Sequence, residues 1–136
     1  MKKSPKKPKI DKKFIKERIK KIGNADIEKV LDKKEEIENK IGSSGPLKKY
    51  IEDVKILFEM VKDYWYGNYK TIPFWVIASV VFALLYVLSP IDLIPDVIPV
   101  IGLLDDAAVM SLCLLLIEQQ LYEYKEWKLA QEGSSQ

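Results

Sequence analysis

The sequence predicts an all-α protein of about five helices, in which an apolar helical hairpin at residues 72–126 packs with amphipathic N-terminal helices. Apolar residues recur at helical spacing in three segments before residue 67. Two later runs, at 74–88 and 107–117, contain no charged residue. The chain has 136 residues, a length that suits one compact domain with a tail. We therefore expect a single helical unit.

Two amphipathic helices are expected in the N-terminal part of the chain. The first begins after Asp11 and ends at Gly23. Its apolar positions are Phe14, Ile15, Ile19 and Ile22. The second begins at Asp26 and keeps a narrow apolar stripe as far as Ile41, with Lys and Glu on its other faces. A stripe of this width predicts packing against another helix.

A third amphipathic helix is expected from Leu47 to Tyr66, after a linker rich in Gly and Ser at 42–46. Six aromatic residues gather at its end and just before the longest apolar run: Tyr64, Trp65, Tyr66, Tyr69, Phe74 and Trp75. Such a cluster is typical of an aromatic belt at a membrane interface, and equally of aromatic side chains in a protein core. Both interpretations stay open at this point.

The expected organisation has four parts. They are a disordered basic tail at 1–10, a charged amphipathic helical module at 11–45, a helical domain with the apolar hairpin at 46–130, and a disordered tail at 131–136. The basic tail is either a solubilising end or a weak attraction for anionic lipid. A nucleic-acid partner is not expected, because no aromatic residues interleave with its lysines.

The apolar hairpin predicts association with a membrane. With Ile72 and Pro73, the run ending at Leu88 would form a helix of roughly 26 Å, near the lower limit for crossing a bilayer. No Lys or Arg occurs between Thr71 and Tyr124, whereas both outer ends of the hairpin are charged. The positive-inside rule then places the protein in the cell membrane with cytoplasmic termini. The alternative is a cytoplasmic, soluble bundle in which the amphipathic helices cover the hairpin.

Several classes of chemistry are excluded by composition. The chain has no histidine and a single cysteine, Cys113, so a Ser/His/Asp hydrolase, an intrachain disulfide and a zinc site built from cysteines cannot form. Cys113 lies in an apolar run and is interpreted as a buried thiol. The N-terminus does not have the pattern of a secretory signal peptide. We expect no catalytic residues and do not expect an enzyme.

The connection between the two apolar runs, residues 89–106 and hereafter the aspartate loop, carries four acids and no basic residue: Asp92, Asp96, Asp105 and Asp106. Buried carboxylates without partners are costly, so these acids must cap helices, reach water or hold a cation. Helix capping is one interpretation, and hard oxygen ligands for Mg²⁺ or Ca²⁺ are another. Handling of protons or ions within a membrane is a third, and it would require an oligomer.

Five further residues give the aspartate loop its expected shape: Ser89, Pro90, Pro95, Pro99 and Gly102. Each proline stops a helix and pushes the preceding residue toward extended geometry, while the glycine permits a tight bend. The loop is therefore expected to be a rigid structural motif.

The stretch from Ser89-Pro90-Ile91-Asp92-Leu93-Ile94-Pro95-Asp96 to Gly102 and Asp105-Asp106 resembles the signature of the YkvA-like family, a bacterial domain of unknown function. The similarity extends over roughly residues 25–128. It implies a small bacterial membrane protein without an assigned activity, cofactor or ligand.

These observations together predict a membrane-associated accessory or adaptor protein with a structural aspartate-rich loop. Membrane lipid is the expected partner, with a second copy or another protein as further possibilities. The alternative is a soluble helical bundle whose aspartate loop binds a divalent cation.

Overall fold

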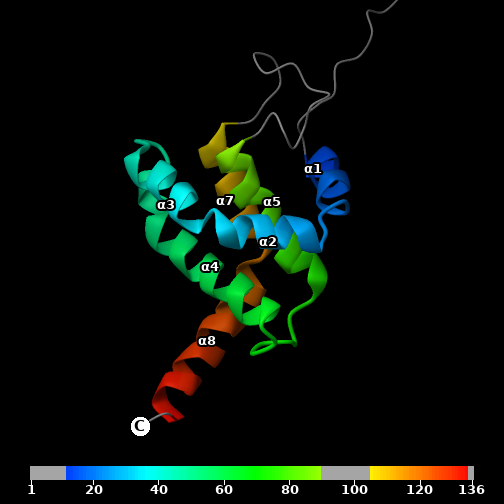
Figure 1. Ribbon diagram of the computed structural model, residues 1–136, viewed down its shortest axis with the longest axis vertical. Helices are drawn as coiled ribbons and strands as arrows, with labels where there is room; N and C mark the ends of the chain where they lie inside the picture. The colour runs from blue at the N-terminus through cyan, green and yellow to red at the C-terminus, as the bar shows by residue number, and fades with distance from the viewer. Residues whose placement is uncertain (1–11, 90–104, 135–136) are drawn as a thin grey trace, which may run out of the picture.

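The computed structural model describes residues 12–89 and 105–134, and every regular element in these two ranges is helical (Figure 1). The predicted all-α class is confirmed. The elements, in chain order, are α1 (Lys12–Ile19), α2 (Asn24–Asp32), α3 (Lys34–Ser43), the 3₁₀ turn η1 (Lys48–Tyr50), α4 (Ile51–Trp65), α5 (Phe74–Leu88), α7 (Asp106–Leu116) and α8 (Glu118–Ser134).

The described residues contain seven α-helices, so the expected number of about five is wrong. The excess arises because two expected helices are each interrupted at one residue. Lys33 (φ −99°, ψ 17°) separates α2 from α3, and Ile117 (φ −106°, ψ 16°) separates α7 from α8. Neither position has a glycine or proline, and the backbone bonds Ile37 N to Lys33 O (2.9 Å) and Leu121 N to Ile117 O (2.8 Å) restart the helix directly. Each helix is therefore interrupted at one residue, without a loop that the sequence could reveal.

Helix α5 is the central element of the fold. Of its 15 residues, 12 are buried, from Val76 to Val87. Contacts to α5 come from α1, α2, α3, α4 and α7, and Figure 1 shows α2 lying across it. A helix that is apolar on all sides is stable in water only if its whole circumference is covered. The bundle supplies that cover.

The amphipathic helices contribute one apolar face each to this core. Fully buried side chains from α2, α3 and α4 are Ile27, Val30, Ile37, Ile41, Val54, Leu57, Phe58, Met60 and Val61. They join the residues of α5 and α7 in one continuous hydrophobic cluster. The segments on either side of the linker at 42–46 therefore share one core.

Helices α5 and α7 pack side by side as the two arms of the apolar hairpin. Val109, Met110 and Cys113 of α7 are buried in their contact. Helix α8 continues from α7 and extends away from the bundle (Figure 1). It ends at Ser134, four residues beyond the domain end expected at 130. Its first half packs through Leu121 and Tyr124, whereas Leu129 is exposed.

Within residues 12–89 and 105–134, no helix is both long enough and apolar enough to span a bilayer, in contrast to the transmembrane hairpin that the sequence predicts.

Shortening a buried side chain of α5 tests its central position. Leu84 is fully buried, so Leu84→Ala should lower the free energy of unfolding by about 2–5 kcal/mol, because it removes apolar contacts and leaves a cavity. Leu115→Ala on the exposed side of α7 is the matched control, with an expected change within about 0.5 kcal/mol. Urea denaturation of the full chain measures both. An equal loss of unfolding free energy in the two variants would contradict the central burial of α5.

Candidate functional site

The C-terminal end of the aspartate loop contains a helix cap. The backbone of Asp105 is extended (φ −73°, ψ 162°), and its Oδ1 accepts a hydrogen bond of 2.7 Å from the backbone N–H of Ala108. Asp106 is the first residue of α7. Both carboxylates therefore lie at the positive end of the α7 dipole. The capping interpretation is confirmed for Asp105.

Lys40 of α3 supplies the positive charge that the aspartate loop lacks in sequence. Its Nζ donates a hydrogen bond of 3.1 Å to the carbonyl oxygen of Leu88, the last residue of α5. Burial raises the pKa of Asp106 above its ordinary value and the charge of Asp105 adds to that rise, while the charge of Lys40 opposes both. One side chain thus interacts with both ends of the loop. Sequence reasoning missed Lys40 because it lies 48 residues before its acceptor.

The remaining loop residues have different outcomes. Ser89 follows α5 as its C-cap, and its N–H donates to the carbonyl of Leu85 at 2.8 Å. Six of the named residues lie outside the described ranges: Pro90, Asp92, Pro95, Asp96, Pro99 and Gly102. Among the residues that the structure does describe, no group of three or more His, Cys, Asp or Glu could hold a metal ion. A divalent-cation role for Asp92, Asp96, Asp105 and Asp106 stays a prediction.

The aromatic cluster at the end of α4 divides into core and surface residues. Tyr69 is buried, with ring centroids 5.2 Å from Tyr124 and 4.8 Å from Trp127 of α8. Phe74 and Trp75, in the first turn of α5, are 42% and 46% exposed. Each of the two interpretations of the cluster therefore applies to some of its members: Tyr69 packs in the core, and the two residues that begin α5 lie at the surface.

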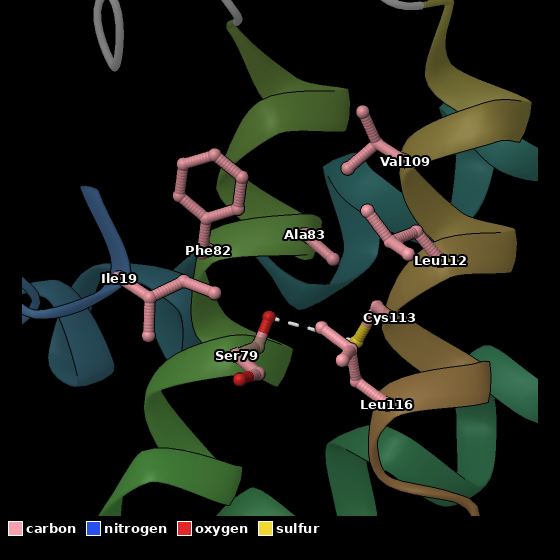
Figure 2. Close-up of a pocket in the computed structure, with 8 residues that line it drawn as sticks. All are labelled: Ile19, Ser79, Phe82, Ala83, Val109, Leu112, Cys113 and Leu116. Atoms are coloured by element: carbon pink, nitrogen blue, oxygen red, sulfur yellow. Dashed lines mark hydrogen bonds between the residues drawn. The ribbon is translucent and has the colours of Figure 1, made fainter. Parts of the chain in front are cut away.

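Trp75 belongs to a groove between α1, the start of α5 and the end of α7. The groove has a volume of about 350 Å³. Its lining residues are Lys16, Ile19, Lys20, Trp75, Ser79 and Leu116, and this set is called the Lys–Trp groove below. Ile19, Ser79 and Leu116 also line a much smaller apolar gap deeper between α5 and α7, shown in Figure 2. The groove is therefore an opening at the edge of the packed core.

A buried carboxylate, Asp63, links α4 to α8 through a polar network that sequence reasoning did not identify. Its Oδ2 accepts hydrogen bonds from the hydroxyl of Tyr124 (2.6 Å) and from Nζ of Lys128 (3.4 Å). Its Oδ1 accepts from Nδ2 of Asn68 at 3.3 Å. Asp63, Asn68, Tyr124 and Lys128 are called the Asp63 network. Tyr124 is 61 residues away in sequence, so no local pattern could reveal the pair.

The network determines the protonation of its members. Burial alone would raise the pKa of Asp63, but the hydrogen bonds from Tyr124 and Asn68 and the charge of Lys128 outweigh it, and the pKa lies below its ordinary value. The pKa of Tyr124 is raised, first by burial and then by its hydrogen bond to the Asp63 carboxylate. The stable state is thus an ionised Asp63 and a neutral Tyr124.

Cys113 lies in the core between α5 and α7. Its Sγ donates a weak hydrogen bond of 3.6 Å to the carbonyl oxygen of Ser79 (Figure 2). Burial raises the pKa of the thiol to about 12. The thiol is therefore protonated and unreactive at neutral pH, which agrees with its interpretation as a packing residue.

The fold and these sites define a class: a small all-α protein built around one buried apolar helix, with an acidic, proline-rich connection after it. Residues 76–112 match the family described as "Protein of unknown function (DUF1232)". The "Uncharacterized membrane protein YkvA" of Bacillus subtilis (strain 168) is 38% identical over 82 residues, which cover 60% of this chain and 77% of that protein. The chain therefore belongs to the YkvA-like (DUF1232) family. No solved structure matches it significantly.

Removal of one hydroxyl tests the Asp63 network. Tyr124→Phe should lower the free energy of unfolding by about 1.5–3 kcal/mol at pH 7, because the buried carboxylate loses a hydrogen bond. Tyr122→Phe, on the exposed side of the same helix, should change stability by less than about 0.5 kcal/mol. Urea denaturation from pH 7 to pH 2 measures both variants.

The pH dependence in that experiment has a defined sign. The pKa of Asp63 in the folded state is below its ordinary value of 3.8. Its stabilising contribution is therefore fully present above about pH 4 and is lost as the pH falls through the folded-state pKa. Tyr124→Phe should reduce this acid-induced loss relative to the unsubstituted chain. An unchanged pH profile would contradict the network's role.

Two substitutions at Asp105 separate capping from cation binding. Asn caps a helix about as well as Asp, whereas Ala does not. Asp105→Asn should leave the thermal midpoint nearly unchanged. Asp105→Ala should lower the free energy of unfolding by about 0.5–2 kcal/mol. Calorimetry with EDTA and then with millimolar Mg²⁺ or Ca²⁺ measures both variants. A cation-dependent rise in the midpoint that Asp105→Asn removes would show that capping is not the whole role of Asp105.

Proposed function

We propose that this protein is a membrane-associated accessory protein that attaches to the surface of a bilayer through the start of α5 and the adjoining face of α1. The observation that carries the proposal is the exposure of Trp75 beside Lys16 and Lys20 of the Lys–Trp groove. Phe74, the preceding residue in the first turn of α5, is also exposed. We place the protein on the cytoplasmic side of the cell membrane, with membrane lipid as its partner.

The chemistry of this surface suits an interface between lipid and water. Trp concentrates at the headgroup level of membranes because its ring is apolar while its N–H needs a polar partner. Lys16 lies in α1 and Lys20 follows its last residue. The backbone N–H of Lys20 donates to the carbonyl oxygen of Lys16 at 3.3 Å, so the two lysines are one turn apart, and both line the groove. Each basic residue held near an anionic bilayer contributes about 1 kcal/mol. Aromatic insertion and lysine attraction would therefore act together at one face.

The name of the relative supports attachment to a membrane, since the 38% identical protein of Bacillus subtilis is called a membrane protein. Attachment through this face uses side chains that are exposed in the folded protein and leaves the buried residues of α5 in the core. The accessory role would then belong to the rest of the surface, with a second copy or another protein as the further partner.

Vesicle flotation tests the proposal. The full chain should float with vesicles of phosphatidylcholine and phosphatidylglycerol, and high salt should lower the bound fraction because it screens the lysines. Phe74→Ser with Trp75→Ser should weaken binding by at least about tenfold, or about 1.4 kcal/mol, because two insertable rings are lost.

Leu115→Ser with Tyr122→Ser is the matched control, since it removes two exposed apolar side chains from α7 and α8 and should leave flotation unchanged. Equal loss in both double variants, or no flotation of the unsubstituted chain, would refute attachment through this face. Flotation that resists a high-salt wash in every variant would point to an embedded hairpin instead.

A further inference from the structure

We propose that the Lys–Trp groove binds a single anionic phospholipid, with an acyl chain in the groove and the phosphate against Lys16 and Lys20. This inference deepens the proposed membrane attachment and rests on it for the source of the lipid. It differs from surface attachment because it requires a discrete, saturable site on the protein.

The size and walls of the groove suit an acyl chain. Its volume of about 350 Å³ lies at the lower end of the range of small-molecule pockets, about 300–1,000 Å³. Ile19 of α1, Leu116 of α7 and Trp75 of α5 form its apolar walls. Three different helices therefore build it, and a chain lying there would contact apolar side chains on several sides.

Among the described lining residues, Ser79 has a polar side chain whose hydrogen bond is already made within the protein. The hydroxyl of Ser79 donates a hydrogen bond of 2.8 Å to the carbonyl oxygen of Trp75, one turn earlier in α5. Since this hydroxyl is already satisfied, an apolar chain can lie over it without leaving a buried donor unpaired. The interior of the groove behaves as apolar.

The rim of the groove is positive. Lys16 and Lys20 both line it, and none of the described lining residues is acidic. Lys20 forms an ion pair with Glu17 at 3.7 Å between two largely exposed side chains, a kind of pair that contributes little to stability. Lysine side chains can lay their methylene stems along an apolar wall and hold the charge at its edge. An amphiphile with a negative head and an apolar tail matches this arrangement.

Charge selects among lipids. A phosphatidylglycerol headgroup carries a net negative charge, whereas phosphatidylcholine is zwitterionic, so the two lysines should discriminate between them. Free phosphate offers the same charge without the chain, and it should bind far more weakly if the apolar walls contribute.

A water-soluble, monomeric lipid tests the site without a bilayer. Isothermal titration calorimetry of the full, unsubstituted chain with dihexanoylphosphatidylglycerol, kept below its micelle concentration, should show saturable binding near one lipid per chain. Dihexanoylphosphatidylcholine and inorganic phosphate should each bind at least tenfold more weakly. Lys16→Gln with Lys20→Gln should weaken binding of the anionic lipid at least tenfold. Lys55→Gln with Lys62→Gln, on exposed positions of α4, is the control of equal charge and should leave it unchanged.

The fluorescence of Trp75 gives an independent readout of position. In the variant Trp65→Phe with Trp127→Phe, Trp75 is the remaining tryptophan, and its emission should shift to shorter wavelength at saturation. Absence of saturable binding, equal affinity for the two lipids, or equal loss in the two lysine variants would overturn the site. If this variant does not fold, the calorimetry on the unsubstituted chain decides.

The outcomes separate this inference from the proposed function. Flotation with vesicles but no binding of the monomeric lipid would leave surface attachment standing and refute the lipid site. Binding of the monomeric lipid without flotation would support the site and refute attachment to bilayers.

Discussion

The structure depends on the enclosure of α5. A helix with no polar face cannot lie at a protein surface in water, since each uncovered side would expose apolar area at about 25 cal/mol per Å². Helices α1, α2, α3, α4 and α7 all contact it, so the short amphipathic helices all cover α5. Each offers a narrow apolar stripe, and together the stripes close around one apolar rod. At the C-terminal end of α5, where the helix reaches the surface, Lys40 donates a hydrogen bond to the carbonyl oxygen of Leu88.

The Asp63 network fixes the part of the chain that α5 does not organise. Besides its side-chain bonds, Asp63 accepts backbone bonds through its carbonyl oxygen from Asn68 (2.8 Å) and Tyr69 (3.1 Å). Asp63 therefore stabilises the turn after α4. Through Tyr124 and Lys128 it also holds the first half of α8 against α4. The buried ring of Tyr69 packs against α8 in the same place. Removal of a partner from this buried carboxylate would be strongly destabilising. The network therefore fixes the position at which α8 leaves the bundle.

Local patterns predicted the elements well where the apolar run or the helix-start residue is distinct. The bounds of α5 follow from the uninterrupted apolar run at 74–88, and the cap at Asp105 follows from an acid before an apolar helix. The breaks at Lys33 and Ile117 were missed because no glycine or proline marks them. The partition of the aromatic cluster was also beyond sequence, since Tyr69 and Trp75 differ only in what the fold places beside them.

The site residues show the same division. The capping role of an Asp next to a helix start can be predicted from the neighbouring sequence. Lys40 and Tyr124, in contrast, form hydrogen bonds with residues 48 and 61 positions away. The membrane prediction depended on hydropathy. Hydropathy indicates that α5 needs an apolar environment, but it does not indicate whether lipid or protein provides that environment. In the described chain, other helices provide it.

The most direct test of this account is amide hydrogen exchange along α5 in the full chain, measured in buffer without lipid or detergent and again with anionic vesicles. Enclosure by the bundle predicts that residues 76–87 are among the slowest to exchange in buffer, and that vesicles add protection mainly at α1 and the first turn of α5. Fast exchange of 76–87 in buffer, with protection appearing only when lipid is added, would contradict the account and show that lipid, not protein, covers α5.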